Sequence, residues 1–398
     1  MRSPSHLHAL CRPRRPVLLG CGIVVGGLVG VLYYAASLLP EGFLETNTGF
    51  AAKVTASAVF VSKRSLDSVY EQELAADGLL ERTFRLFLSI KVDHQDQTAT
   101  ASALGVTRTA LFREGFGCTR VIDRTVDELR TEVSDVGETR PQSRPQSRRR
   151  PWATMGEDDE KRFDRDLLEA TIEADDPRSA ITLNQMLRMT SGLKWNEESS
   201  DHVSDMTRML FRESSMAGFA AQAPVAAAPG KELVYSSGTT NLICEALRNS
   251  FKEDREYWEF PRRELFDPIG MSSAVFELDE SGTLVGSSFC FATARDWARF
   301  GQLYLDDGVV DGRRILPEGW VVGASQGTKI SKRRYGRHFW LPHDKSLPAG
   351  TFYCRGFEGQ LIAIVPEKRG VIVRLGSTRD RKAWDPDRFV ASIIKALR

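Results

Sequence analysis

The sequence predicts an α+β protein in which helices cover antiparallel sheets. The first observation is a group of neighbouring strand patterns between residues 84 and 121. The second is a pair of apolar, β-branched runs, 361–365 and 370–375, joined by a turn at 366–368, which predicts a buried hairpin. Helical patterns precede and follow these strands, and such an arrangement favours an α+β layered fold.

The predicted elements follow one another in a definite order. Residues 84–92 alternate in polarity, 93–96 read as a turn, and 98–104 and 108–112 are further strands, which together predict a small meander. Apolar periodicity predicts helices over 66–80, 164–173, 181–189, 295–305 and 389–397. With 398 residues and 41% hydrophobic residues the chain can bury a sizeable core, and its net charge of +1 gives no support for a nucleic-acid partner.

The N-terminal segment contains a long uncharged run, from Val17 to Leu39. As a helix it would reach about 35 Å, enough to cross a bilayer. Arginines precede it and glutamates follow it, so we expect the N-terminus in the cytoplasm and the main domain on the exported side. The alternative is a cleaved signal peptide with a site at 35–37, but the run is long for that purpose.

The six cysteines give little indication of a disulfide or metal framework. Four of them, Cys118, Cys244, Cys290 and Cys354, follow the predicted membrane span, where disulfides could form. Their wide spacing fits neither a zinc site nor a disulfide-dense scaffold, which favours separate free thiols. The histidines show no metal-ligand spacing either, so we expect neither a metal nor a cofactor.

An arginine- and proline-rich repeat divides the chain. Its composition predicts an extended, solvated linker. We therefore expect four parts: a basic tail and membrane anchor over 1–40, an N-terminal extension with the meander over 41–137, the linker over 138–151, and the main domain over 152–398.

The segment 235–241, Tyr-Ser-Ser-Gly-Thr-Thr-Asn, is the most informative candidate site. It lies between the tight turn Pro229-Gly230 and an apolar helical run, 242–247. A tyrosine held at such a turn can act as a general base for a serine nucleophile. A packed aromatic residue is the alternative role for Tyr235.

Several segments in the same order resemble the β-lactamase-related serine hydrolases, which include class C β-lactamases, penicillin-binding-protein-like esterases and aminohexanoate-oligomer hydrolases. The segments that carry the resemblance are 181–193, 229–238, 266–271, 292–297, 312–320 and 356–360. The resemblance implies a β-lactamase/transpeptidase-like fold and hydrolysis of a small ester or amide through an acyl-serine. It also leaves open a peptide-like ligand that is bound but not cleaved.

The resemblance also implies roles for individual residues. Tyr235 matches the general base, and Ser237 stands where many members carry an asparagine that hydrogen-bonds the substrate. Phe357, Glu358 and Gly359 match a Lys-Thr-Gly or His-x-Gly segment on a sheet-edge strand, whose backbone completes an oxyanion hole. Phenylalanine in place of the usual cation or imidazole argues against penicillin-like antibiotics as substrates.

The family's nucleophile, a Ser-x-x-Lys on a helix, is not found at its place in the order. It should precede residue 181, but no serine occurs between Ser147 and Ser179. Two strands and a helix need roughly 35 to 40 residues, more than the stretch 152–180 offers. Ser392 and Lys395 have the right spacing but lie in the predicted terminal helix. The family's nucleophile precedes the segment that matches 181–193, so chain order excludes this pair. We therefore expect a family member whose hydrolysis is impaired, or a non-catalytic, membrane-tethered binding protein.

Overall fold

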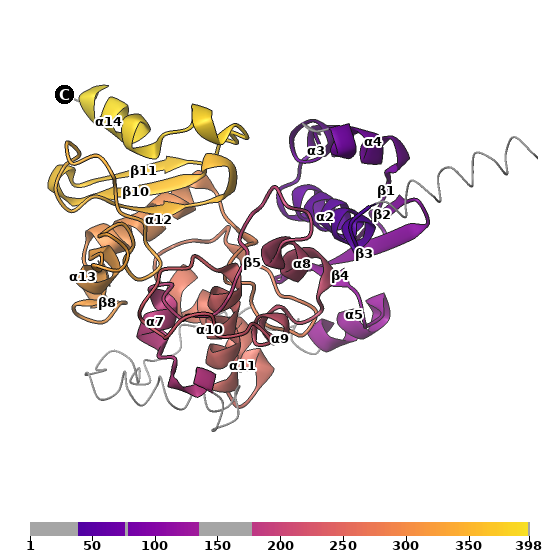
Figure 1. Ribbon diagram of the computed structural model, residues 1–398, viewed down its shortest axis with the longest axis horizontal. Helices are drawn as coiled ribbons and strands as arrows, with labels where there is room; N and C mark the ends of the chain where they lie inside the picture. Colours follow the sequence, from indigo (N-terminus) through magenta and orange to yellow (C-terminus); the bar gives the residue numbers. More distant parts are fainter. Residues whose placement is uncertain (1–38, 76–78, 135–176, 397–398) are drawn as a thin grey trace, which may run out of the picture. The chain divides into compact units, whose positions relative to one another are not determined.

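The computed structural model describes residues 39–75, 79–134 and 177–396, and separates the chain into two compact units, Met1–Phe43 and Leu44–Arg398. Residues 17–38 of the predicted span 17–39, the predicted linker 138–151 and the predicted helix 164–173 lie outside the described residues. Within the described ranges, no helix combines the length and apolar character that crossing a bilayer requires. The second unit contains the two main sheets and most of the helices (Figure 1).

The predicted meander is confirmed as a four-stranded antiparallel sheet in the order β1-β2-β3-β4. Its strands are β1 (Ser89–Asp93), β2 (Thr98–Ala103), β3 (Val106–Arg113) and β4 (Gly117–Val121). The predicted turn after β1 forms because the Asp93 carboxylate accepts hydrogen bonds from the backbone N–H groups of Gln95 and Asp96.

Two sequence predictions in this region are wrong. The single helix expected over 66–80 is α3 (Leu66–Gln72), and a separate helix, α4, covers Leu79–Phe87. Residues 84–87 are therefore helical, and the strand begins only at Ser89. Short apolar runs such as Phe84–Leu88 fit both periodicities, so alternation alone could not distinguish a helix from a strand there.

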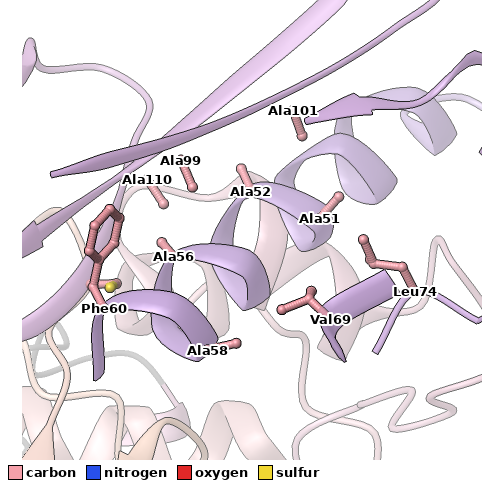
Figure 2. Close-up of a cluster of buried hydrophobic side chains, with 11 residues drawn as sticks. Ala51, Ala52, Ala56, Ala58, Phe60, Val69, Leu74, Ala99, Ala101 and Ala110 are labelled. Atoms are coloured by element: carbon pink, nitrogen blue, oxygen red, sulfur yellow. The ribbon is translucent and has the colours of Figure 1, made fainter. Parts of the chain in front are cut away.

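Small side chains set the distance between α2 (Phe43–Ala56) and the meander. Figure 2 shows Ala52 and Ala56 of this helix facing Ala99 and Ala110 of the sheet. Ala99 and Ala110 are also directly paired across β2 and β3. Alanine at each contact lets the helix backbone approach the sheet closely, and a π-helical turn, Ser57–Val61, continues the helix beyond Ala56.

The predicted hairpin is confirmed as β10 (Leu361–Val365) and β11 (Gly370–Arg374), with β9 (Phe352–Arg355) completing the sheet in the order β11-β10-β9. Every residue of β10 is buried. Its Ile362 and Ile364 pack against α12 (Ala294–Leu305), while the alternate residues pack against α14 (Pro386–Ala396). The two helices lie on opposite faces of the sheet (Figure 1), as expected of a strand buried on both sides.

The remaining elements connect the two sheets. The helices are α5 (Val126–Ser134), α7 (Leu183–Leu187), α8 (Asp205–Arg212), α9 (Met216–Ala220), α10 (Ser237–Asn249), α11 (Asp254–Pro261), a π-helical turn at Arg262–Phe266, and α13 (Trp320–Ser325). Two short hairpins are β5 (Val275–Phe276) with β6 (Cys290–Phe291), and β7 (Val309–Val310) with β8 (Arg313–Arg314). The cysteines that the structure describes are free thiols, as expected.

Buried carboxylates join the N-terminal extension to the rest of the second unit. Glu277 forms an ion pair with Lys53 and accepts a hydrogen bond from the backbone N–H of Cys118 at 2.7 Å. Glu280 accepts hydrogen bonds from three consecutive backbone N–H groups, those of residues 122–124, at 2.7 to 3.0 Å. Residues 44–134 therefore pack into the same compact unit as residues 177–396.

Candidate functional site

Tyr235 lies immediately before α10. Ser236 is the N-cap of the helix, and its hydroxyl accepts a hydrogen bond from the backbone N–H of Thr239 at 2.9 Å. The residue before Tyr235 is also held in place, because the backbone N–H of Val234 donates to the carbonyl of Met189 at 2.9 Å. The sequence motif therefore places the Tyr235 side chain at a fixed helix start.

Two aromatic residues enclose the Tyr235 ring. Its centroid lies 5.1 Å from that of Trp340 and 5.9 Å from that of Tyr335. Trp340 pairs with Tyr353 of the edge strand β9 through two backbone hydrogen bonds of 2.8 and 2.9 Å. The Arg355 guanidinium, at the end of the same strand, lies 5.3 Å from the Trp340 ring centroid. This packing places Tyr235 beside the sheet edge.

The surroundings of Tyr235 keep its hydroxyl protonated. Burial raises the pKa of Tyr235 to about 12, and the nearby Glu197 carboxylate adds to the increase. Trp340 and the Arg355 cation lower this pKa by smaller amounts. A general base that works near neutral pH needs a pKa close to that pH. In this arrangement Tyr235 is a poor base.

Ser237 is buried and its polar groups are already paired. Its backbone N–H donates to one oxygen of Glu197 at 2.9 Å, and its hydroxyl donates to the other at 2.5 Å. The indole N–H of Trp195 donates to the same carboxylate at 2.5 Å. Burial raises the pKa of Glu197, and these hydrogen bonds oppose the increase. Glu197 thus anchors the first turn of α10.

A glycine makes this anchor possible. A Cβ atom on Gly238 would lie 2.5 Å from the Trp195 ring and 3.0 Å from the Cβ of Ala220. Glycine at this position therefore lets Trp195 lie against α10, where its indole reaches Glu197. Packing against Trp195 thus explains the glycine of the Tyr-Ser-Ser-Gly motif, which the sequence alone did not reveal.

The segment 357–359 is a 3-10 turn between β9 and β10, not part of a strand as the resemblance implied. Phe357 is 60% exposed, and Glu358 has a left-handed φ of 53°. The Gly359 carbonyl accepts a hydrogen bond from Arg374 at 2.7 Å. Gly356 alone separates the turn from Arg355, whose guanidinium packs on Trp340 of the Tyr235 cluster.

Two serine–lysine pairs in the chain have Ser-x-x-Lys spacing, Ser191 with Lys194 and Ser392 with Lys395. Our sequence interpretation treated Ser191 only as part of a helix stop and did not weigh its pairing with Lys194. Ser191 is buried near Thr239, whereas Lys194 is exposed, and the left-handed φ of 81° at Gly192 separates them. Ser392 is exposed in α14 and donates to the Phe389 carbonyl at 2.7 Å.

The structure brings Tyr235 and Ser237 together and adds residues that sequence reasoning missed. These are Glu197, Tyr335, Trp340 and Arg355. The signal that could have revealed Glu197 is weak, since it is one acid within the polar run 196–201. No group of three or more metal-ligating side chains occurs in the ranges that the structure describes.

The chain belongs to the Beta-lactamase family, whose model matches residues 152–392. This match gives the main domain the β-lactamase/transpeptidase-like α+β fold that the sequence motifs implied. Recognition of the family from short segments is therefore confirmed.

Among characterised proteins, the chain is similar to the 6-aminohexanoate-dimer hydrolase of Paenarthrobacter ureafaciens. They are 29% identical over 119 residues, which is 27% of this chain and 30% of that enzyme. A putative 6-aminohexanoate-dimer hydrolase from Bacillus anthracis is 22% identical, with a TM-score of 0.48 over 58% of this chain and 64% of that one. A class C beta-lactamase is 15% identical, with a TM-score of 0.42 over 59% and 75% of the two chains. The match thus spans less than two thirds of the first two relatives.

Proposed function

We propose that the chain carries the substrate site of an ester- or amide-hydrolysing β-lactamase relative, and that its own hydrolysis is impaired. The observation that supports the site is the position of Tyr235 at the start of α10, beside the edge strand β9, with aromatic rings around it. The family's acyl-serine chemistry needs a base at such a place.

The proton chemistry of the described residues supports the proposed impairment. A phenol with a pKa of about 12 stays protonated at neutral pH. The hydroxyl of Ser237 donates to Glu197 and is not free to hold a substrate carbonyl. Ser191 is buried whereas Lys194 is exposed, and the Ser392 hydroxyl, in the terminal helix, donates to the Phe389 carbonyl. Loss of a nucleophile lowers the rate by several orders of magnitude.

The same observations favour a second role, that of a ligand-binding pseudoenzyme. The Tyr235 cluster would then hold a small ester, amide or peptide-like ligand by ring contacts and one phenolic hydrogen bond. Such a ligand would be bound and released unchanged. The two roles differ in whether any serine is acylated.

Covalent labelling separates these roles. The full chain is treated with a fluorophosphonate probe, and the labelled residue is located by mass spectrometry, with Tyr235→Phe as the matched variant. We expect no serine to be labelled above the level in denatured protein, while small amides still raise the melting temperature. Stoichiometric labelling that the Tyr235→Phe change abolishes would refute the impaired state.

We further propose that residues 17–39 tether the protein to a membrane with residues 41–398 on the exported side. The charge-free run, with arginines before it and glutamates after it, supports this topology. Fractionation tests it: the full chain should stay with membranes after alkaline extraction. A chain recovered in the soluble fraction with residues 1–37 removed would instead indicate a cleaved signal peptide.

A further inference from the structure

A shallow surface depression of about 370 Å³ lies beside the Tyr235 site. One wall is formed by residues 231–233 and the other by residues 330–332. Leu233 stands two residues before Tyr235, and the second wall leads into Tyr335, whose ring packs on that of Tyr235. The depression and the Tyr235 cluster are therefore built on the same two segments.

Cations dominate the depression. Lys231 and Lys332 line it, and Lys329 and Arg333 are exposed in the same turn as Lys332. Among the residues that the structure describes, no hydrogen bond or ion pair holds the side chains of these four cations. The acidic residue of the lining is Glu232. The lining sets two unpaired lysines against one carboxylate, and two more unpaired cations lie in the adjoining turn, which favours an anionic ligand.

The turn that carries three of the cations is held in one conformation. Thr328 and Ser331 exchange two backbone-to-hydroxyl hydrogen bonds, both of 3.1 Å. The backbone N–H of Arg333 donates to the Thr328 carbonyl at 2.8 Å. Lys332 and Arg333 both have left-handed φ values, 50° and 60°, which strain residues other than glycine.

We propose that this depression is an anion subsite for the carboxylate of a small N-acylated amino acid or similar linear amide or ester. The inference rests on the proposed function, since it places the reacting bond at Tyr235. The apolar side chains of Leu233 and Ile330 would contact the aliphatic part of the ligand.

A matched pair of probes tests the subsite without requiring turnover. Binding of N-acetylleucine and its uncharged amide, N-acetylleucinamide, is measured by calorimetry on the full chain at low ionic strength. We expect the carboxylate to bind more tightly, and the double variant Lys231→Gln/Lys332→Gln to lower its affinity by about tenfold, since each exposed charge pair contributes a small factor. Added salt should reduce the preference.

Two controls sharpen the measurement. The double variant Lys252→Gln/Lys345→Gln removes two exposed charges that do not line the depression, and should leave the affinity for N-acetylleucine unchanged. Glu232→Gln removes the opposing charge of the lining and should raise that affinity.

Several outcomes would overturn the subsite. These are equal affinity for acid and amide, equal effects of the two double variants, or stronger binding of glycerophosphoserine than of N-acetylleucine, which would indicate a lipid headgroup. Carboxylate-selective binding without serine labelling supports the subsite and shows only that the protein does not hydrolyse the ligand through an acyl-serine. Serine labelling without any preference for the carboxylate refutes the subsite alone.

Discussion

Replacing Lys53 by methionine should strongly destabilise the protein. The Lys53 side chain is 2% exposed and that of Glu277 is fully buried. The Lys53 ammonium donates to the Glu277 carboxylate, to the Cys118 carbonyl at 2.7 Å and to the Ser57 hydroxyl at 3.2 Å. Burial raises the pKa of Glu277, and Lys53 is the main group that opposes this. Without the ammonium, Glu277 is left as a buried charge without a counter-ion.

The magnitude follows from these contacts. Breaking a buried ion pair by removing one partner costs about 3 to 5 kcal/mol, and an unsatisfied buried carbonyl adds to this. Methionine still fills the space next to Phe289, whose ring centroid lies 4.1 Å from the Lys53 nitrogen, so the loss is chiefly electrostatic. Domains are typically stable by about 5 to 15 kcal/mol, and the change is therefore a large fraction of the whole.

Urea unfolding, followed by tryptophan fluorescence at pH 7, measures the effect. Lys53→Met should lower the free energy of unfolding by about 3 to 5 kcal/mol, while Lys252→Met, at an exposed lysine, should change it by less than about 0.5 kcal/mol. The double variant Lys53→Met/Glu277→Gln should lose less than the two single variants together. Additive losses, or a loss below about 1 kcal/mol for Lys53→Met, would refute the reasoning.

Three further predictions concern other parts of the molecule. Burial lowers the pKa of His338 from 6.5 to about 4. The unfolded chain therefore binds the proton first, and the free energy of unfolding should fall by up to about 3 kcal/mol as the pH falls from 6.5 to 4. Asparagine tolerates the left-handed φ of 59° at this position, so His338→Asn should remove this pH dependence in urea titrations at several pH values. Gly301→Ala places a Cβ 2.5 Å from a Val371 methyl carbon and should lower the melting temperature, with partial recovery when Val371→Ala is added. Glu197→Gln removes a negative charge and should lower the pKa of Tyr235, read as the difference in tyrosinate absorbance with and without Tyr235→Phe; an unchanged value would contradict the electrostatic role of Glu197.

The sequence carried enough information for the sheets but not for all helix boundaries. Strands β2, β3, β10 and β11 were predicted within one or two residues, because alternation and β-branched runs are local signals. Residues 84–87 were assigned to a strand because their short apolar run fits helix and strand equally well, and the helix expected over 66–80 proved to be two.

The candidate site was predictable only in part, for a physical reason. Tyr235 and Ser237 belong to a contiguous motif, so the sequence indicated them directly. Glu197, Trp340 and Arg355 reach Tyr235 from distant positions, and only the tertiary fold brings them there. The hydrogen bond between Ser237 and Glu197 decides what the serine can do, and no spacing rule anticipates it.

The ion pair between Lys53 and Glu277 also limits when the N-terminal extension can finish folding during synthesis. The two residues are 224 positions apart, so at ribosomal rates of 5 to 20 residues per second, Lys53 waits about 11 to 45 s for its partner to be made. During that interval the Lys53 ammonium and the backbone N–H groups of Cys118 and residues 122–124 lack the Glu277 and Glu280 carboxylates that they bind in the folded protein. The N-terminal extension can therefore complete these buried contacts only after the segment 277–280 has been synthesised.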